Sequence, residues 1–370
     1  MSTAVWDAFF EPVPGYLDTA SIGLPPTTTV DAVATVIEGW RRGRYRPQDF
    51  DEYVVRARAA WGRLVGLPVG TIAIGSTVSA LVGTVAGSLA DGSRVLVPAG
   101  DFTSVLFPFL VQQERGRVSV TEVELADLVA SVDDGTDLVA VSSVQSSDGR
   151  RVDVPALLDA AGRHGARVLL DVTQSCSWLP LDCSRVDYVV CAGYKWLLCP
   201  RGVAFLAVRP DLLDAITPVS AGWYAGADVW SSVYGSPLRL ALDARRLDTS
   251  PAWFSWVGAA HSLELLASLD TEAVHAYTVA LADRFLAGLG LPPAGSAIAA
   301  VSQEGADELL EAAGVRASLR AGRARLSFHL YNQEADVDRA VDALSGALPR
   351  SGAQRHAEAR VQPLRADPGL

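Results

Sequence analysis

The chain has 370 residues, of which 49% are hydrophobic and 20% charged, and its formal net charge at pH 7 is −11. This length allows one large domain and a smaller one, and this composition is typical of a folded enzyme, not of a disordered chain. The acidic balance argues against nucleic acid or an anionic membrane as the main partner.

The four cysteines all fall within one short stretch, from Cys176 to Cys199, with Cys183 and Cys191 between them. Their spacings do not fit a zinc-binding pair and no histidine lies among them, so we expect no metal site. Buried free thiols in a reducing cytoplasm are the interpretation that we favour. The first residues lack a basic segment and an apolar run, so no signal peptide is expected. No apolar run is long enough to cross a bilayer.

The first part of the chain predicts an irregular lead-in over 1–15, then a short strand and a proline-stopped loop over 16–26. Helix is expected over 27–66, with a break at the arginine-rich segment 41–47. From about residue 70, short β-branched stretches alternate with amphipathic ones, which indicates a largely parallel sheet covered by helices on both faces. Strands are expected at 71–74, 93–97, 138–144, 167–170, 188–191 and 203–208, and helices after the turn 75–80 and at 103–112 and 154–164.

After about residue 250 the pattern changes to two long helices, two further strands and a closing helix. We therefore expect an α/β fold with four parts. An N-terminal arm (1–30) packs near the active site, a large α/β domain (31–250) and a small α+β domain (251–349) follow, and the tail (350–370) is poorly ordered. The late helices are expected at 254–269, 273–289 and 336–348, and the late strands at 296–302 and 325–329.

The most informative feature is a carboxylate at the end of one apolar run and a lysine after the next. Asp171 ends the strand 167–170, and Lys195 lies within Val-Val-Cys-Ala-Gly-Tyr-Lys-Trp-Leu-Leu. A desolvated lysine has a lowered pKa and forms Schiff bases with aldehydes. Pyridoxal 5'-phosphate (PLP) is an aldehyde that also requires a carboxylate at its pyridine nitrogen. Taken alone, Asp171 is equally well explained as a capping or turn aspartate, and Lys195 as a surface lysine. Together they predict a PLP site.

Gly75-Ser76-Thr77-Val78-Ser79 follows the strand 71–74 and opens a helix, where free N–H groups and hydroxyls suit a phosphate. An ordinary helix cap has the same sequence, so the signal is weak by itself. Ligands in open α/β sheets bind beyond the carboxyl ends of the strands, so we expect this turn to meet Asp171 and Lys195 at one edge. A nicotinamide-dependent dehydrogenase is excluded, because no Gly-x-Gly-x-x-Gly turn follows a first strand.

Asp171-Val-Thr-Gln-Ser-Cys-Ser-Trp and Tyr194-Lys-Trp-Leu-Leu-Cys-Pro-Arg-Gly resemble the class V aminotransferase family of fold-type I PLP enzymes. This family includes cysteine desulfurases, isopenicillin N epimerase-like enzymes, kynureninases and C–S lyases. Tyr16-Leu-Asp-Thr-Ala-Ser and Arg325-Leu-Ser-Phe-His-Leu-Tyr-Asn match its N- and C-terminal blocks, so the resemblance covers roughly 15–348. It implies the fold-type I architecture, with a mostly parallel sheet between helices, and PLP as the cofactor.

The resemblance implies a role for each cofactor residue. Lys195 forms the internal aldimine with PLP and later moves the α-proton, and Asp171 pairs with the protonated pyridine nitrogen. Gln174 hydrogen-bonds the ring oxygen beside the aldimine, and Phe102 stacks on the ring, where desulfurases have a histidine. The phosphate is held by three hydroxyl residues: Ser76, Thr77 and, from the partner subunit, Thr249.

The threonine contact implies a homodimer with the active site at the subunit interface, and the family resemblance implies a small-molecule amino-acid substrate. Arg325 matches the arginine that grips the substrate carboxylate, a bidentate role suited to guanidinium. Ser146 lies where relatives often have an asparagine near the substrate. The other substrate-binding residues implied are Ala20, Ser21 and Tyr194.

Two departures from the family narrow the reaction. No cysteine follows Cys199, so the desulfurase nucleophile before the Arg325 block is missing. Tyr194 stands where desulfurases usually carry a histidine, and it either donates a proton or packs. We expect transamination or β-elimination of the C–S lyase type, on an α-amino acid or an amino-acid conjugate. Racemisation, epimerisation or other PLP chemistry in secondary metabolism is the alternative. A non-catalytic binding subunit with a PLP-enzyme fold is a further alternative. The joint presence of four residues argues against it: Asp171, Lys195, Gln174 and Arg325.

Overall fold

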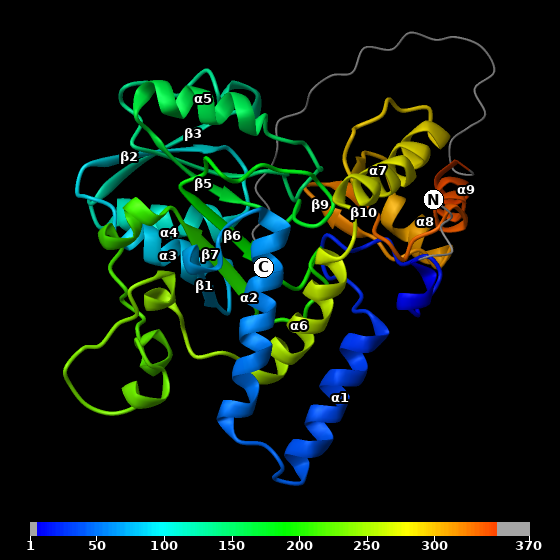
Figure 1. Cartoon of the computed structure of the whole chain (residues 1–370). Helices are drawn as coiled ribbons and strands as arrows, with labels where there is room; N and C mark the ends of the chain where they lie inside the picture. The colour runs from blue at the N-terminus through cyan, green and yellow to red at the C-terminus, as the bar shows by residue number, and fades with distance from the viewer. Residues whose placement is uncertain (1–5, 346–370) are drawn as a thin grey trace.

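The computed structural model describes residues 6–345, which form a seven-stranded sheet and a three-stranded sheet with helices around them (Figure 1). The tail predicted over 350–370 lies outside the described residues, and the N-terminal arm is described from residue 6 onward. The domain boundary near residue 250 stays a prediction.

The large sheet has the order β1-β7-β6-β5-β4-β2-β3. Within it β7 pairs antiparallel with both β1 and β6, while the pairs from β6 to β3 are parallel. The other six strands therefore share one direction, and β1, β5 and β6 end at the same edge, which confirms the mostly parallel sheet. The strands are β1 (Ile72–Gly75), β2 (Ser93–Pro98), β3 (Val118–Val123), β4 (Leu138–Ser142), β5 (Arg167–Asp171), β6 (Tyr188–Ala192) and β7 (Ala204–Val208).

Helices cover both faces of this sheet because its strands are apolar on both sides. In β5, Val168 and Leu170 belong to the core under three helices, while Leu169 faces the core under the other two. Burying each such side chain contributes about 1.5–3 kcal/mol. The first face carries α2 (Asp51–Val65), α5 (Val154–His164) and α6 (Trp253–Ala267), and the second carries α3 (Val78–Gly87) and α4 (Thr103–Glu114).

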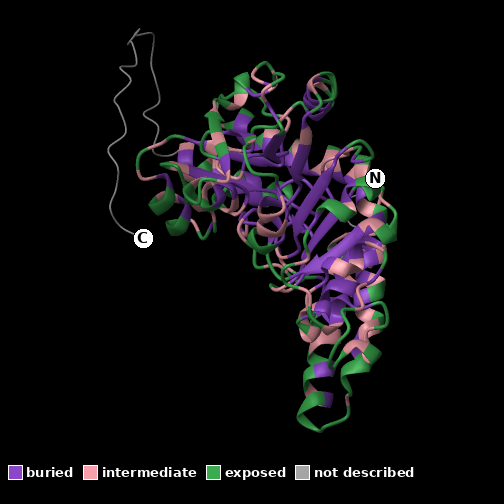
Figure 2. Ribbon diagram, turned by 90° about the vertical axis from the view of Figure 1, so that its left-hand side faces the viewer, coloured by how far each residue is buried: buried purple, intermediate pink, exposed green. Residues whose placement is uncertain are grey.

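The arginine-rich segment lies at the tip of a helical hairpin formed by α1 (Thr27–Arg41) and α2 (Figure 1). This tip is exposed at the lower end of the molecule (Figure 2). Arg41 and Arg42 pair there with Glu38, at 2.8 and 2.5 Å. These arginines therefore form a solvated helix end and do not belong to a ligand pocket.

The small sheet is antiparallel, with the order β8-β10-β9. The N-terminal segment reaches it through two isolated bridges, Tyr16 with Arg316 and Asp18 with Ser327, in place of the predicted short strand. β10 begins two residues before the expected strand, and β3, β9 and α8 were not expected. The elements are β8 (Ile298–Val301), β9 (Ser318–Arg320), β10 (Arg323–Ser327), α7 (Thr271–Gly288), α8 (Ala306–Ala312) and α9 (Glu334–Ser345).

Two features are absent from residues 6–345. None of the helices there is sufficiently long and apolar to span a membrane. In the same range, no three or more His, Cys, Asp or Glu side chains are grouped so that they could hold a metal ion.

Candidate active site

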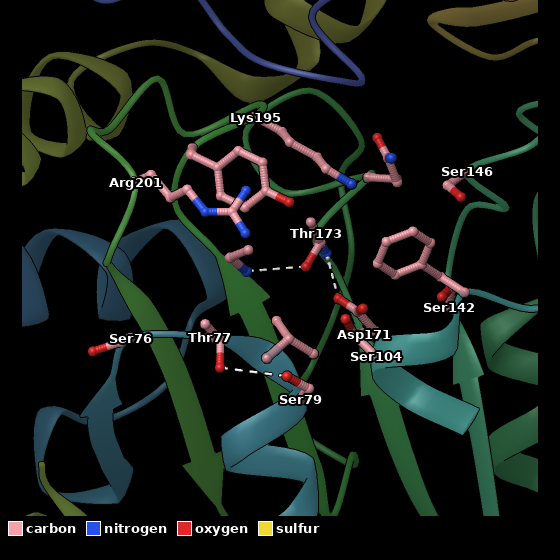
Figure 3. A pocket seen from close by; sticks show the side chains of 15 residues that line it. Ser76, Thr77, Ser79, Ser104, Ser142, Ser146, Asp171, Thr173, Lys195 and Arg201 are labelled. Atoms are coloured by element: carbon pink, nitrogen blue, oxygen red, sulfur yellow. Dashed lines mark hydrogen bonds between the residues drawn. The ribbon is translucent and has the colours of Figure 1, made fainter. Parts of the chain in front are cut away.

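One pocket opens at the edge where β1, β5 and β6 end (Figure 3). The structure brings eight of the predicted residues together in its wall. These are Ser76, Thr77, Phe102, Ser146, Asp171, Gln174, Tyr194 and Lys195. Val78 and Ser79, which belong to the predicted helix-opening turn, also line it. The sequence did not single out the rest of the wall, which consists of Ser104, Ser142, Thr173, Ala192 and Arg201.

Lys195 follows β6 and places a nearly buried amine in the pocket, with 6% of the residue exposed. Burial lowers the pKa of this amine to about 8; Asp171 opposes this, and Arg325 and Arg320 add to it. A substantial fraction of the amine is therefore uncharged near neutral pH, which is the nucleophilic form.

Lys195 is also the only lysine in the chain, since every other member of the 31 lysines and arginines is an arginine. A surface that uses arginine throughout has no need of a lysine for charge. The count is therefore a sequence signal for a catalytic amine, and it is stronger than the apolar context alone.

The backbone after Lys195 is held by groups from distant parts of the chain. The Trp196 indole N–H donates to Gln174 Oε1 at 2.8 Å. The Trp196 carbonyl accepts the Ser177 hydroxyl at 2.8 Å and His329 Nε2–H at 3.1 Å. The His329 ring stacks on Trp196, and burial lowers the pKa of His329 to about 4, so this imidazole is neutral. His329 lies in the C-terminal block of the sequence, but its role there was not foreseen.

Asp171 ends β5 with a buried carboxylate that accepts the Thr173 backbone N–H at 2.8 Å. Burial raises the pKa of Asp171 to about 6, although the Thr173 hydrogen bonds lower it, and Asp101 raises it further. A buried carboxylate in this state gains from a cationic partner in the pocket. A protonated pyridine nitrogen would be such a partner.

Asp101 fixes the position of Phe102 at the start of α4. Its carboxylate accepts the Ser142 N–H at 2.7 Å, the Ser142 hydroxyl at 2.6 Å and the Phe102 N–H at 2.6 Å. The Phe102 ring is 42% exposed in the pocket wall, and its centroid lies 4.9 Å from Lys195 Nζ. This is an apolar face that a flat ligand ring would cover.

The N-terminus of α3 presents three exposed hydroxyl residues to the pocket: Ser76, Thr77 and Ser79. Thr77 caps the helix, because its hydroxyl oxygen accepts the Ala80 N–H at 3.3 Å. Arg201 lies above them in Figure 3, with its guanidinium carbon 4.9 Å from the Tyr194 ring centroid. Within residues 6–345 Arg201 makes no recorded ion pair. Hydroxyls, a helix N-terminus and a free guanidinium together suit a phosphate.

Gln174 links the pocket to the N-terminal arm. Its amide nitrogen donates one hydrogen to the Ala20 carbonyl at 3.1 Å, while its oxygen accepts from Trp196. One of the two amide hydrogens is therefore left for a ligand. Ala20 does not line the pocket itself, and its N–H donates to Ser327 Oγ at 2.9 Å.

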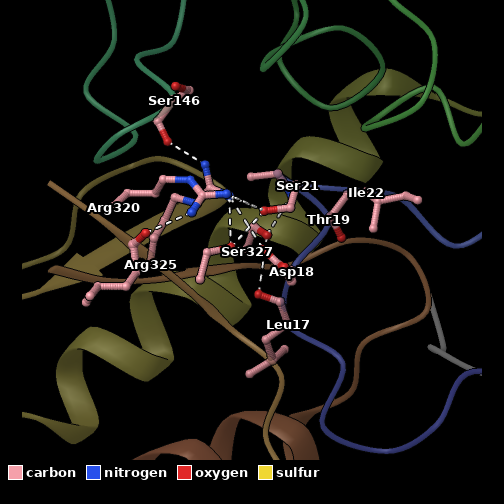
Figure 4. Close-up of polar contacts among 12 residues, drawn as sticks. Leu17, Asp18, Thr19, Ser21, Ile22, Ser146, Arg320, Arg325 and Ser327 are labelled. Carbon is pink, nitrogen blue, oxygen red and sulfur yellow. Dashed lines mark hydrogen bonds and ion pairs between the residues drawn. The ribbon is translucent and has the colours of Figure 1, made fainter. Parts of the chain in front are cut away.

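Arg325 does not line the pocket; it lies against the wall residue Ser146, whose carbonyl accepts Arg325 Nη1 at 2.6 Å (Figure 4). Nη2 donates to Ser21 Oγ at 2.7 Å and to Ser318 Oγ at 3.2 Å, and it lies 3.5 Å from Asp18 Oδ1. Only 2% of Arg325 is exposed, and its Nε has no partner within the described residues. The expected carboxylate clamp and Ser21 thus form a polar cluster beside the pocket.

Thr249 also lies outside the pocket wall of its own chain. Its N–H donates to the Ile74 carbonyl at 3.2 Å, at the end of β1. The preceding Asp248 is buried, pairs with Arg58 at 2.6 Å and accepts the Ile74 N–H at 2.8 Å. This ion pair fixes both the end of β1, from which Ser76 follows, and the backbone that carries Thr249.

The four cysteines are buried and carry free thiols. Burial raises the pKa of Cys183 to about 12, and it raises the pKa values of Cys191 and Cys199 above their ordinary range. These groups stay thiols at neutral pH, and thiols are poor nucleophiles compared with thiolates.

Comparisons with known proteins agree with this geometry. The family model described as aminotransferase class-V matches residues 74–308. The uncharacterized aminotransferase YcbU of Bacillus subtilis is 30% identical, over 78% of this chain and 82% of its own. Isopenicillin N epimerase of Streptomyces clavuligerus is 26% identical, over 78% of this chain and 83% of its own.

Solved structures show the same fold. The cysteine desulfurase CsdA of Escherichia coli superposes with a TM-score of 0.81 at 20% identity, over 94% of this chain and 98% of that one. The cystine C–S lyase C-DES superposes with a TM-score of 0.79 at 20% identity, over 90% of this chain and 97% of that one. The expected fold and cofactor are confirmed. The chain belongs to the class V aminotransferase family, and it is a PLP-dependent enzyme of the fold-type I architecture.

Proposed function

We propose that this enzyme acts on an α-amino acid or an amino-acid conjugate by transamination or β-elimination. The observation that carries the proposal is the amine of Lys195, with a pKa of about 8, in a pocket whose described wall holds no histidine, glutamate or cysteine. One base on one side of the substrate suffices for both reactions, because each begins with removal of the α-proton.

The wall residues fit PLP. Lys195 offers an uncharged amine, Asp171 a buried carboxylate and Phe102 an exposed ring face, while Ser76 and Thr77 stand at a helix N-terminus. We assign the ring nitrogen to Asp171, the ring face to Phe102 and the phosphate to the two hydroxyls. When bound, PLP supplies an aldehyde that condenses with amines and a ring that accepts the electron pair from a substrate α-carbon.

The surroundings of Lys195 suit a group that takes up a proton and returns it. Burial favours the neutral amine, which accepts the α-proton at Nζ. The protonated form is then stabilised by the ring face of Tyr194, whose centroid lies 5.7 Å from Nζ. Asp171 adds an opposite charge that also favours the ammonium. Neither the neutral amine nor the ammonium of Lys195 is strongly favoured over the other, so the group can both accept and return a proton.

Epimerisation is the second candidate, and Tyr194 is the observation that favours it. Two-base inversion at the α-carbon needs a second proton donor that reaches the face opposite Lys195, and the Tyr194 phenol is a proton donor in the pocket wall. A relative is named isopenicillin N epimerase. Tyr194→Phe separates the cases: it abolishes inversion if the phenol is that donor, and it leaves transamination or elimination largely intact.

An enzyme thiol has no place in this proposal. All four cysteines are buried, and none lies in the segment before Arg325. Cys176→Ser, Cys183→Ser, Cys191→Ser and Cys199→Ser should therefore each retain turnover. A folded but inactive single variant would restore thiol chemistry as the mechanism.

We further propose a homodimer in which Thr249 contributes to the partner subunit's phosphate site. The proposal is supported by the position of Thr249 at the end of β1 but outside its own pocket wall. Light scattering tests the dimer, and Thr249→Ala should weaken PLP binding. The buried free thiols favour the cytoplasm as the compartment.

The decisive experiment combines visible absorption of the PLP-loaded protein with a panel of amino acids and cysteine conjugates, and identifies the products by mass spectrometry. Keto acid with pyridoxamine phosphate indicates transamination, while keto acid with ammonia and a released thiol indicates β-elimination. Borohydride should fix PLP to the peptide that contains Lys195, and Lys195→Ala should remove this label. Labelling that survives in Lys195→Ala at any site except the N-terminal amine would refute the assignment.

A further inference from the structure

Two guanidinium groups come together beside the pocket wall (Figure 4). Arg325 Nη2 and Arg320 Nη2 both donate to the hydroxyl oxygen of Ser21, at 2.7 and 3.3 Å. Arg325 is buried in β10, whereas Arg320 is exposed at the end of β9. The pair therefore has one rigid member and one that solvent and ligands reach.

Strand pairing explains why these residues meet. Ser318 lies opposite Arg325 in the antiparallel pair, and Arg320 lies opposite Arg323. Residues two apart on a strand share a face, so all four side chains project from the same side of the β9–β10 hairpin. Arg323 is neutralised there by Asp148 at 3.0 Å. Arg320 forms no ion pair with any residue of the described range 6–345.

The cluster carries more positive than negative charge. Its one carboxylate is Asp18, which lies 3.5 Å from Arg325 Nη2 and also accepts the Ser318 hydroxyl. Arg325 Nε is buried without a partner in the described part of the chain. Burial and, to a smaller extent, the charge of Arg320 lower the pKa of Arg325 to about 10. Two guanidinium charges that share one carboxylate are stabilised by a bound anion.

The cluster adjoins the reacting centre. Arg325 Nη1 donates to the carbonyl of Ser146, and Ser146 lines the pocket that holds Lys195. Burial is the main cause of the lowered pKa of Lys195, and the positive charges of Arg325 and Arg320 lower this pKa as well. The cluster is therefore joined to the pocket wall through Ser146, next to the space where a molecule bound at Lys195 would lie.

We propose that Arg320 and Arg325 together select α-amino acids that carry a second acidic group, a carboxylate or a sulfur oxyacid. The proposal rests on the proposed function and names its substrate class. Arg325, held rigidly behind Ser146, takes the α-carboxylate. Arg320, which is exposed and unpaired within the described residues, takes the acid of the side chain.

The test compares acids with their isosteric amides, aspartate with asparagine and glutamate with glutamine, on the PLP-loaded enzyme. Binding is followed by the change in visible absorption, and turnover by kcat/KM. A charged hydrogen bond to a guanidinium predicts that the acid is favoured about ten- to hundredfold. Arg320→Gln should remove this preference by weakening binding of the acid while leaving the amide unchanged.

Arg323→Gln is the matched control, because it removes one positive charge from the same hairpin face and leaves Asp148 paired with Arg150 at 2.8 Å. It should retain the acid preference, which excludes a general effect of net charge. Thermal melting of both variants checks that each is folded.

Three results would overturn the proposal. The wild type could bind amides as well as acids, or Arg320→Gln could weaken both equally, as it would if both guanidiniums held the α-carboxylate. In either case the enzyme still acts on amino acids, and only the substrate class is wrong. If no amino acid alters the spectrum of the PLP-loaded enzyme, the proposed function fails as well.

Discussion

In the protein without PLP, we expect the amine of Lys195 to titrate with a pKa of about 8, compared with its ordinary value of 10.5. The difference corresponds to about 3 kcal/mol, and its main cause is burial. At pH 7.5 roughly a quarter of the amine is then uncharged, against roughly one part in a thousand for an ordinary lysine. Because the unfolded chain holds this proton more tightly, folding loses about 3 kcal/mol as the pH falls from about 10.5 to about 8.

The measurement is direct, because no other lysine contributes a signal. Reductive methylation with ¹³C-formaldehyde labels only Lys195 and the N-terminal amine, and the spectrum of Lys195→Met assigns the two peaks. Following the lysine peak against pH by NMR gives its pKa. Asp171 raises this pKa and Arg325 lowers it. Asp171→Asn should therefore shift the titration to lower pH and Arg325→Gln to higher pH.

A Lys195 peak that titrates near 10.5 would refute the reasoning, since the amine would then be hydrated in solution. Shifts of the same sign in Asp171→Asn and Arg325→Gln would also refute it. Such a result would mean that changes in packing, and not the two charges, set the pKa.

Three further predictions concern the support of the site. Burial lowers the pKa of His329 to about 4, so the wild type should lose about 3 kcal/mol of stability as pH falls from about 6.5 to about 4. His329→Gln should lack this loss, and parallel urea-unfolding free energies for the two proteins across that range would contradict it. Arg201→Ala should weaken PLP binding about tenfold and leave binding of pyridoxal unchanged, because the guanidinium serves the phosphate; equal losses for both ligands would exclude that role. Arg58→Ala should destabilise the fold by about 3–5 kcal/mol, because it leaves the Asp248 carboxylate buried and unpaired. Arg58→Met with Asp248→Leu should recover part of this loss in chemical denaturation, and no recovery would show that the charges themselves are not the cause.

The fold was largely predictable because its central strands are buried on both faces and read as continuous apolar runs. β3 was missed because it is an edge strand: only Val118 of its six residues is fully buried, and Ser119 and Glu122 are exposed. β9 has three residues, of which Leu319 and Arg320 are exposed. A strand that pairs with only one neighbouring strand and buries few side chains leaves no periodic pattern in the sequence.

In the site, the meeting of Asp171, Lys195 and Ser76 was predictable from local sequence, because parallel strands place their carboxyl ends at one edge. The contacts that hold the backbone after Lys195 could not be predicted in this way. The His329 ring reaches the Trp196 carbonyl across 133 positions of chain. A contact of this kind depends on how the small sheet packs against the large one, and no local spacing encodes it.

Of the four buried thiols, Cys176 and Cys183 lie between β5 and β6, Cys191 lies in β6, and Cys199 lies shortly after Lys195. A thiol reagent reaches them only when this part of the protein opens. Their rate of labelling therefore measures how often the scaffold of the active site opens, without any added probe. Comparison of that rate with and without PLP would give the contribution of the cofactor to the local opening equilibrium.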